Sequence, residues 1–226
     1  MSEPRPTVVP KEERVEVPRS ARFFLLGDRP GSFDEIWFVL HGIGQLAAEF
    51  ITYFADLDDG HRLVVAPEAL NRYYTASISI PSSERPVGAT WMTREDRDAE
   101  IRDYVRYLDL LHARLATGSP NARIVVVGFS QGGATAARWA ALGSSKIDRL
   151  ILWGALLPPD LNLTKGMPSF RGASLTYVVG NRDQYINATM IDQEKTRLKT
   201  AAIQADFVEF DGGHSIKRSV LADLSR

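Results

Sequence analysis

The sequence predicts a doubly wound α/β fold with a mostly parallel β-sheet. Short, continuous apolar runs alternate with stretches of helical periodicity, which is the pattern of repeated strand–helix–strand units. The runs are rich in Val, Ile and Leu and lack polar alternation, as expected for parallel strands buried on both faces. One run ends in a Gly-x-Ser-x-Gly sequence that opens a helix. The chain has 226 residues, 44% of them hydrophobic, so it can bury one core and we expect a single domain over residues 1–226.

The N-terminal part is expected to form an antiparallel edge of this sheet. Residues from Met1 to about Glu13 are rich in proline and charge and should be loosely ordered. Val15–Val17 and Arg22–Leu26 are β-type runs separated by Pro18, a residue that edge strands tolerate. These two runs therefore suit an antiparallel edge pair.

From residue 36 onward, strands and helices are expected to alternate. The strands are assigned from uninterrupted apolar runs and the helices from apolar residues three and four positions apart. The expected strands are 36–40, 63–67, 124–127, 150–154, 175–180 and 207–210. The expected helices are 46–57, 94–116, 134–142, 188–205 and 216–224.

Two segments show no clear periodicity, residues 68–93 and residues 158–171. A loop as long as the first is usually functional in a compact domain, here as the wall of a pocket. The alternative is that its aromatic residues only pack the loop onto the core. Neither segment is long enough for a large lid. The candidates for an acyl-binding wall, chosen from their positions, are Tyr74, Trp91, Met92, Leu156 and Leu157.

The composition narrows the classes of function and partner. A formal net charge of −1 gives no electrostatic basis for binding nucleic acid. Cysteine is absent, so a disulfide framework, a thiolate nucleophile and a Cys-ligated metal are excluded. The first ten residues contain three prolines and no apolar signal-peptide core, and no apolar run is long enough to span a bilayer. We therefore expect a cytoplasmic protein without stable membrane insertion.

The run Ile124–Val127 leads into Gly128-Phe129-Ser130-Gln131-Gly132-Gly133, which is the pattern of a nucleophile elbow. A serine at such a turn has strained backbone, and neighbouring Cβ atoms would clash, so glycines stand two residues before and after it. The following helix points its N-terminus at the serine, where the N–H of Gln131 can stabilise an oxyanion. Ser130 is the predicted nucleophile; a tight structural turn is the alternative.

A serine nucleophile needs a histidine as its base. The chain has four histidines, His41, His61, His112 and His214. His112 lies on a charged helix and is expected at the surface, and His61 precedes a strand, which places it at the wrong edge of the sheet. His41 ends a strand at the active edge but comes before Ser130. His214 follows the last strand at that edge and is the predicted base.

The carboxylate that orients the base is expected between the serine and the histidine in the chain. Asp183 follows the strand 175–180 at the correct edge and is the first choice. Asp160, which follows the preceding strand, is the fallback. Asp211 is near His214 in sequence, but that proximity alone does not orient the imidazole.

A second oxyanion donor is expected from the loop His41-Gly42-Ile43-Gly44, which leads from a strand to a helix beside the elbow. Its glycines let the backbone approach a ligand closely. The N–H of Ile43 is the first choice and that of Gly44 the second. The alternative is an ordinary glycine-rich turn.

Several motifs together resemble the phospholipase/carboxylesterase family of the α/β-hydrolase superfamily, which includes acyl-protein thioesterases. The matching motifs are Leu40-His41-Gly42-Ile43-Gly44, Ala66-Pro67-Glu68-Ala69, Gly128-Phe129-Ser130-Gln131-Gly132-Gly133, Gly180-Asn181-Arg182-Asp183 and Gly213-His214. The resemblance implies an α/β-hydrolase fold without a large lid. It implies Ser130 as nucleophile, Asp183 and His214 as its partners, and Ile43 and Gln131 as oxyanion donors. Two motifs depart from the family pattern: Gln45-Leu46-Ala47 stands where many members have an aspartate, and Trp91-Met92-Thr93 replaces a Trp-Phe/Tyr-Asp string.

The sequence therefore predicts a serine carboxylesterase that needs neither metal nor cofactor and acts on a small-molecule ester or thioester with a small to medium acyl group. Two alternatives remain at this stage. One is a catalytically silent hydrolase fold that serves as a small-molecule receptor or interaction module, and the other is an acyltransferase that uses the same triad. Nothing in the sequence decides the oligomeric state or the natural substrate.

Overall fold

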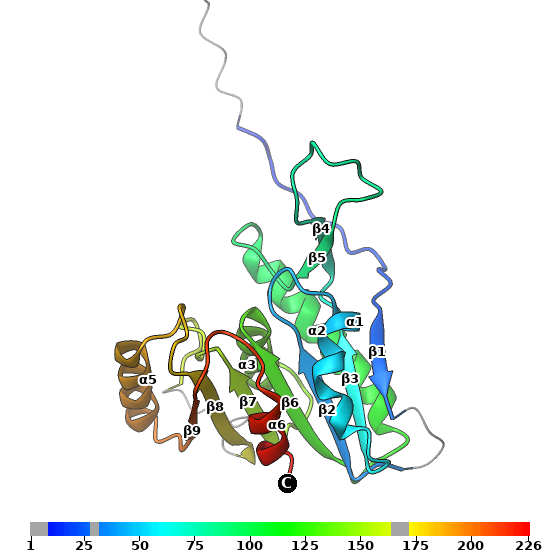
Figure 1. Cartoon of the computed structure of the whole chain (residues 1–226). Helices are drawn as coiled ribbons and strands as arrows, with labels where there is room; N and C mark the ends of the chain where they lie inside the picture. Colours follow the sequence, from blue (N-terminus) through cyan, green and yellow to red (C-terminus); the bar gives the residue numbers. More distant parts are fainter. Residues whose placement is uncertain (1–8, 28–31, 164–171) are drawn as a thin grey trace, which may run out of the picture.

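The computed structural model describes residues 9–27, 32–163 and 172–226, and a seven-stranded sheet runs through them (Figure 1). Its strands are β1 (Phe23–Leu26), β2 (Glu35–Leu40), β3 (Arg62–Pro67), β6 (Arg123–Phe129), β7 (Arg149–Trp153), β8 (Ser174–Gly180) and β9 (Asp206–Phe210). They lie in the order β1-β3-β2-β6-β7-β8-β9. All neighbours are parallel except β1, which is antiparallel to β3. The predicted parallel sheet with an antiparallel N-terminal edge is confirmed.

The edge itself is built differently from the expectation. Val15–Val17 forms no strand, and its two valines are largely exposed. Only the second run becomes a strand, and it pairs with β3, with Leu25 opposite Val65. Pairing with β3 makes β1 part of the seven-stranded sheet. An isolated pair of β1 with Val15–Val17 would be only marginally stable.

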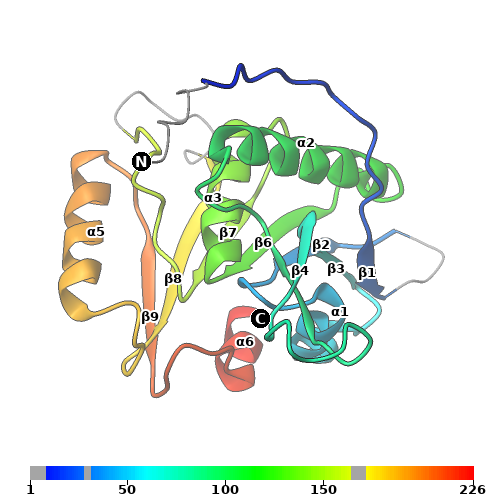
Figure 2. The same cartoon turned by 90° about the horizontal axis from the view of Figure 1, so that it is seen from above.

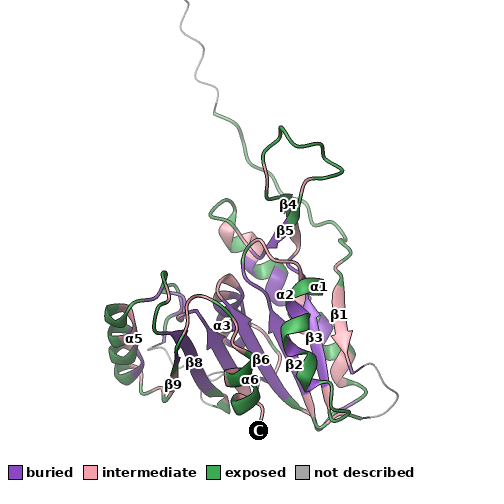
Figure 3. Cartoon of the chain, viewed as in Figure 1, coloured by how far each residue is buried: buried purple, intermediate pink, exposed green. Residues whose placement is uncertain are grey.

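Helices cover both faces of the sheet (Figure 2). One face carries α2 (Arg97–Ala116), α3 (Gln131–Leu142) and α5 (Ala188–Thr200), and the other carries α1 (Ala47–Phe50), the 3₁₀ helix η1 (Ile51–Leu57) and α6 (Arg218–Leu224). Side chains of strand β2 alternate between the two faces: Phe38 packs with the first group of helices and Val39 with the second. The central strands are accordingly buried along nearly their whole length (Figure 3).

Several helix ends differ from the sequence expectation. The helix expected at 46–57 is divided into α1 and η1, and α2 begins only at Arg97 because Asp96 adopts a left-handed backbone conformation. Helix α5 ends at Thr200 because Ala202 has a positive φ of 54°. Of the irregular segment predicted at 158–171, residues 164–171 lie outside the described residues. No helix in the described part of the chain is long and apolar enough to cross a membrane.

The segment 68–93 contains a β-hairpin that the sequence did not predict, formed by β4 (Asn71–Tyr74) and β5 (Val87–Thr90). Figure 1 shows it projecting beyond the carboxyl ends of the central strands. The base of β5 joins the loop after β2: the N–H of Gly44 donates to the carbonyl of Ala89 at 2.8 Å, and the N–H of Ala89 donates to the carbonyl of Gln45 at 3.2 Å. The hairpin therefore supports the loop in which an oxyanion donor was predicted.

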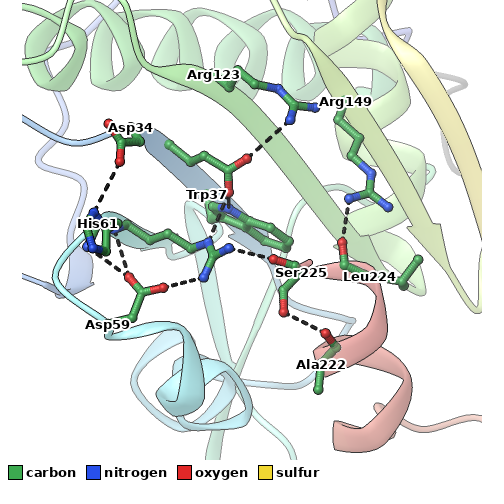
Figure 4. Close-up of polar contacts among 11 residues, drawn as sticks. Asp34, Trp37, Asp59, His61, Arg123, Arg149, Ala222, Leu224 and Ser225 are labelled. Carbon is green, nitrogen blue, oxygen red and sulfur yellow. Dashed lines mark hydrogen bonds and ion pairs between the residues drawn. The ribbon is translucent and has the colours of Figure 1, made fainter.

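A polar network closes the opposite, amino-terminal edge of the sheet (Figure 4). Arg62 donates to the carboxylate of Glu35 at 3.0 Å and to the carbonyl of Ser225, and Arg149 donates to the carbonyl of Leu224. These arginines donate to the last carbonyls of α6, which have no partner within the helix. The helix that follows the His214 loop is thereby fixed at its far end. His61 lies in this network, with Nδ1 3.2 Å from the carboxylate of Asp34, and so belongs to the edge away from the elbow.

Candidate active site

The candidate residues gather at the carboxyl edge of the sheet because each follows a parallel strand. The His41 loop follows β2, Ser130 follows β6, Asp183 follows β8 and His214 follows β9. In the strand order, β6 is next to β2 on one side and β7 on the other, and β8 and β9 lie beyond β7. Open α/β sheets bind ligands at this edge.

Ser130 lies on a strained turn between β6 and α3. Its φ of 53° and ψ of −120° are outside the regions that residues with a Cβ normally adopt. The turn is held by its N–H, which donates to the Trp153 carbonyl at 2.9 Å. A Cβ at Gly132 would meet the carbonyl oxygens of Leu40 and His41, and a Cβ at Gly128 would meet Gly133, so both positions require glycine. The sequence predicted this geometry from the glycine spacing.

His214 and Asp183 are hydrogen-bonded, with Nδ1 of the imidazole 2.7 Å from Oδ2 of the carboxylate. The carboxylate is almost fully buried, with 1% of the side chain exposed. Its other oxygen accepts the backbone N–H groups of Tyr185 at 2.8 Å and Ile186 at 3.2 Å. Because a carboxylate only accepts, Nδ1 carries the ring proton and Nε2 carries the lone pair.

Within the described residues, Nε2 of His214 is the one buried side-chain nitrogen or oxygen without a hydrogen-bond partner. The ring is packed between Phe129 and Tyr185, with centroid distances of 4.9 and 4.7 Å. It also lies against Gly154, whose φ is +55° and where a Cβ would come within 2.9 Å of the ring. Gly154 directly follows Trp153, which binds the N–H of Ser130. His214 and Ser130 are therefore both in contact with the end of β7.

The competing carboxylates have other partners. Asp160 accepts two hydrogen bonds from the buried Arg138, at 3.1 and 2.8 Å, and pairs with Arg97 at 2.8 Å. The hydrogen bonds from Arg138, aided by Arg97, hold the pKa of Asp160 well below its ordinary value. Asp211 is exposed and pairs with Arg182. Among the described residues, neither Asp160 nor Asp211 forms a hydrogen bond or ion pair with His214.

The other histidines also have defined surroundings. His112 is half-buried, because its ring lies 6.1 Å from Phe38 and 6.4 Å from Trp139, so the expectation of a surface residue was wrong. Burial lowers its pKa. His41 is completely buried. Its ring nitrogens bind the backbone of Gly42 and Ala69.

The loop after β2 leaves one backbone donor open. The N–H of Gly42 donates to the side-chain oxygen of Gln45 at 2.8 Å, that of Gln45 to the Gly42 carbonyl at 3.3 Å, and that of Gly44 to Ala89. In the part of the chain that the structure describes, the N–H of Ile43 has no acceptor. The N–H of Gln131, at the first position of α3, likewise has none, as helix N-termini leave their first donors unpaired. A Cβ at Gly42 would lie 3.3 Å from the Cβ of Ser130, so the loop is close to the serine.

The side chain of Gln131 has a role that the sequence did not indicate. Its oxygen accepts the N–H of Trp91 at 3.0 Å, and its amide nitrogen donates to the carbonyl of Met92 at 2.8 Å. The hydroxyl of Thr90 bonds the same amide at 3.0 and 3.1 Å. The residue after the serine therefore ties the base of the hairpin to the elbow. A single sequence offers no signal for this contact, because the partners are two backbone groups and one hydroxyl that lie 39 to 41 positions away.

The five candidates for the acyl-binding wall occupy different environments. Tyr74 is 48% exposed on the hairpin and lies under Arg85, 4.5 Å from the guanidinium. Trp91 is 1% exposed, with its indole N–H bound to the His41 carbonyl at 2.9 Å. Met92 and Leu156 are half-buried, whereas Leu157 is buried at 3%. Met92 and Leu156 therefore have surface that a ligand could contact, and Trp91 and Leu157 lie behind.

The segment after β7 that contains Leu157 is fixed by helix α5. The buried carboxylate of Glu194 accepts the N–H of Leu157 at 3.0 Å and the hydroxyl of Tyr177 at 2.7 Å. Arg197 donates to the carbonyls of Leu157 at 2.9 Å and Pro158 at 2.8 Å. Burial and the neighbouring Glu194 raise the pKa of Tyr177, so its hydroxyl stays a donor to the carboxylate. The described residues contain no group of three or more His, Asp or Glu side chains placed to hold a metal ion.

Comparison with known proteins places this geometry in context. The sequence model of the phospholipase/carboxylesterase family matches residues 36–226. A comparison with curated proteins gives no match. The fold is similar to that of acyl-protein thioesterase 2 from Zea mays, with a TM-score of 0.67, 16% identity, and coverage of 91% of this chain and 96% of that chain.

Two bacterial structures show the same likeness. A phospholipase/carboxylesterase from Dyadobacter fermentans has a TM-score of 0.64 and 18% identity over 94% of this chain and 99% of that chain. A carboxylesterase from Mesorhizobium loti has a TM-score of 0.66 and 16% identity over 91% of this chain and 94% of that chain. With the sheet order described above, these similarities establish the α/β-hydrolase fold.

Proposed function

The chain belongs to the phospholipase/carboxylesterase family, and we propose that it is a serine carboxylesterase that hydrolyses ester or thioester bonds through an acyl-enzyme on Ser130. The observation that carries this proposal is Nε2 of His214, a buried ring nitrogen without a partner. Asp183 holds the ring proton on Nδ1, so the open nitrogen has the lone pair that a general base needs. Buried ring nitrogens are normally hydrogen-bonded, so an open acceptor at this edge of the sheet suits a residue that takes a proton during a reaction.

The reaction follows from these positions. Nε2 of His214 takes the proton of the Ser130 hydroxyl as Oγ forms a bond to the substrate carbonyl carbon. The carbonyl π electrons move to the oxygen, which accepts hydrogen bonds from the N–H groups of Ile43 and Gln131. When the oxyanion collapses, the bond to the alcohol or thiol breaks and the imidazolium gives its proton to that leaving group. Water then attacks the acyl-enzyme with His214 again acting as base, which restores the serine and releases the acid.

Whenever His214 holds the proton taken from Ser130 or from water, the buried Asp183 carboxylate stabilises the imidazolium. The ring keeps its orientation because Phe129 and Tyr185 pack against it. Ser130 lies on a strained turn directly beyond the end of β6 and is partly exposed, and the glycines at positions 128 and 132 allow the close backbone contacts of that turn. Each donor in the oxyanion site is a backbone N–H whose position is set before substrate arrives, so no reorganisation is needed as charge develops.

The surroundings support a small to medium apolar acyl group. Ile43 and Tyr185 are exposed by 57% and 63%, and Met92 and Leu156 are half-buried. These side chains are apolar or aromatic, they lie in segments that follow the strands at the edge of Ser130, and Ser130 is itself partly exposed. We propose that Met92 and Leu156 contact the acyl group, with Tyr74 at the hairpin and Trp91 and Leu157 as support from behind.

The test compares the wild type with Ser130→Ala on p-nitrophenyl acetate, butyrate, octanoate and palmitate. We expect kcat to fall by at least about 10³-fold in the variant, because the acyl-enzyme can no longer form. The chain-length profile of the wild type measures the size of the acyl site. Ser83→Ala, at an exposed serine of the hairpin loop, is the matched control and should keep wild-type rates.

Equal rates in the wild type and Ser130→Ala would refute the proposal. A folded wild type that binds these esters without turning over any of them would favour a receptor. Adding an alcohol acceptor and measuring how much new ester forms beside free acid separates hydrolysis from acyl transfer.

A further inference from the structure

The buried His41 has a defined proton position. Its ring is 0% exposed, Nδ1 lies 2.7 Å from the carbonyl oxygen of Gly42, and the N–H of Ala69 donates to Nε2 at 3.1 Å. A carbonyl oxygen can only accept and a backbone N–H can only donate. The ring proton of His41 is therefore on Nδ1, and Nε2 bears the lone pair.

Charges near this ring are few and balanced. Glu68, directly before Ala69, is the charged residue that acts on the imidazole, and its buried carboxylate pairs with Arg22 at 2.5 Å and Arg72 at 3.0 Å. Burial lowers the pKa of His41 and outweighs the opposing effects of the Gly42 carbonyl and Glu68. The other ring contact is with Trp91, at 5.3 Å between centroids, which carries no charge.

The bond to Gly42 has a consequence for the neighbouring donor. The carbonyl of Gly42 and the N–H of Ile43 belong to one planar trans peptide, in which C=O and N–H point in opposite directions. Nδ1–H of His41 binds this carbonyl at 2.7 Å and the N–H of Gln45 binds it at 3.3 Å, so the shorter bond from His41, with that of Gln45, fixes the direction of the Ile43 N–H. Rotation of this peptide would turn the N–H away from the oxyanion. The ring itself is anchored outside the loop, by the Ala69 N–H.

The segment that contains Ala69 also contacts the far end of the loop after β2, at Ala47. The carboxylate of Glu68 accepts the N–H of Ala47 at 3.4 Å, and the carbonyl of His41 accepts the indole N–H of Trp91. The motif Ala66-Pro67-Glu68-Ala69 thus contacts both ends of the loop that contains Ile43.

We propose that His41 is a positioning residue for the esterase reaction, which as the neutral, Nδ1-protonated imidazole holds the Gly42–Ile43 peptide with its N–H directed at the oxyanion. The inference rests on the proposed function, since it assigns a role within that reaction. His41 does not touch the substrate. It acts through the Gly42 carbonyl.

Three variants separate the two bonds of the ring. His41→Asn retains a side-chain N–H near Nδ1 that can donate to Gly42, His41→Gln retains an oxygen near Nε2 that can accept from Ala69, and His41→Phe retains neither. We expect kcat on p-nitrophenyl butyrate to fall by about 10²-fold in His41→Phe, the lower end of the loss that follows removal of one oxyanion donor, because the longer bond from the Gln45 N–H to the same carbonyl remains. His41→Gln should be close to it, and His41→Asn should lose roughly tenfold. KM should stay within about threefold in all three, because the interaction is made in the transition state.

A purely structural role predicts a different pattern. Thermal stability would fall in all variants, and kcat of the folded fraction would not follow the order Asn, Gln, Phe. His61→Gln, at an exposed histidine on the opposite edge, is the control and should keep wild-type kcat. Wild-type kcat in folded His41→Phe, or a His41→Asn no more active than His41→Gln, overturns the inference.

A measurement on the wild type tests the ring tautomer on which the inference depends, even if the variants fail to fold. Long-range ¹H–¹⁵N spectra resolve the tautomers of the four histidines of this chain. His41 should show a protonated Nδ1 and a bare Nε2 at neutral pH, and an Nε2-protonated or doubly protonated ring overturns the inference. If Ser130→Ala keeps wild-type rates, the proposed function itself has failed. If Ser130→Ala is inactive and His41→Phe is fully active, only the role of His41 has failed.

Discussion

Asp183→Asn tests the orientation of the imidazole, and its effect can be worked out from three hydrogen bonds. In the wild type, one carboxylate oxygen accepts two backbone N–H groups, from Tyr185 and Ile186, and the other accepts Nδ1–H of His214. An asparagine has one oxygen and one NH₂ group for these two positions. If its oxygen stays with the two backbone donors, its NH₂ faces Nδ1. The ring must then accept at Nδ1, so its proton moves to Nε2 and the base can no longer take the serine proton.

The residual activity of Asp183→Asn depends on how often the asparagine amide adopts the opposite orientation, with its oxygen toward Nδ1 of His214. This orientation would keep the correct tautomer but point the NH₂ group at two buried N–H donors, and each unsatisfied donor costs about 1–3 kcal/mol. A total of about 2–6 kcal/mol leaves between roughly 3% and 0.004% of the molecules in the active arrangement. We therefore expect kcat to fall between about 30-fold and about 2 × 10⁴-fold, a range that includes the loss of about 10⁴-fold for the corresponding substitution in a well-studied Ser-His-Asp protease.

The assay is the steady-state hydrolysis of p-nitrophenyl butyrate by the wild type, Asp183→Asn and Asp211→Asn at neutral pH, with thermal midpoints recorded for each. Asp211 is the matched control, because it is an exposed aspartate three residues from His214 whose partner is Arg182. We expect its variant to stay within roughly twofold of the wild type. A folded Asp183→Asn that keeps more than about a tenth of wild-type kcat would contradict the reasoning, as would an equal loss in Asp211→Asn.

Two further predictions concern the framework of the site. Gly132→Ala should lower the thermal midpoint by several degrees or prevent folding, because its Cβ would meet the backbone carbonyls of Leu40 and His41; Gly172→Ala, with open space around the added atom, should leave the midpoint unchanged. The ion cluster that lowers the pKa of Asp160 contributes stability that is present above about pH 4 and is lost as pH falls toward the folded-state pKa. Asp160→Asn should therefore be less stable than the wild type at neutral pH in urea unfolding, and the difference should shrink on acidification; a difference that is constant with pH would contradict this.

The framework of the fold and the positions of Ser130, Asp183 and His214 could be predicted because they depend on local patterns. Each residue follows an apolar run, and parallel strands bring their carboxyl ends to one edge. The choice of Asp183 over Asp160 had only strand position behind it. The structure adds the reason that sequence lacked: Arg138 and Arg97 occupy the carboxylate of Asp160, and these arginines come from helices far away in the chain.

The hairpin and the role of Gln131 could not be predicted because their signals are not local. Asn71–Tyr74 is half-buried or exposed throughout, so it lacks the alternation by which a strand is identified. Its partner β5 contains Gly88, which weakens strand propensity but is needed because a Cβ there would meet Gly44. Two of the three partners of the Gln131 amide are backbone groups, of Trp91 and Met92, which any sequence would supply. The close contact between the backbones of Gly88 and Gly44 therefore requires a glycine in β5, and this glycine made the segment resemble a loop in the sequence.

These contacts also give a physical meaning to Gln45, which stands where many members of the family have an aspartate. Its side-chain oxygen accepts the N–H of Gly42 at 2.8 Å, and its backbone carbonyl accepts the N–H of Ala89. An amide thus supplies the acceptor that closes the loop on itself without adding a negative charge. Ile43, the proposed oxyanion donor, lies within this closed loop, and a carboxylate so near a developing oxyanion would oppose it unless a cation compensated the charge. At this point of the loop, the chain therefore keeps a fixed hydrogen bond and a neutral environment together, which suits a donor set made of backbone N–H groups alone.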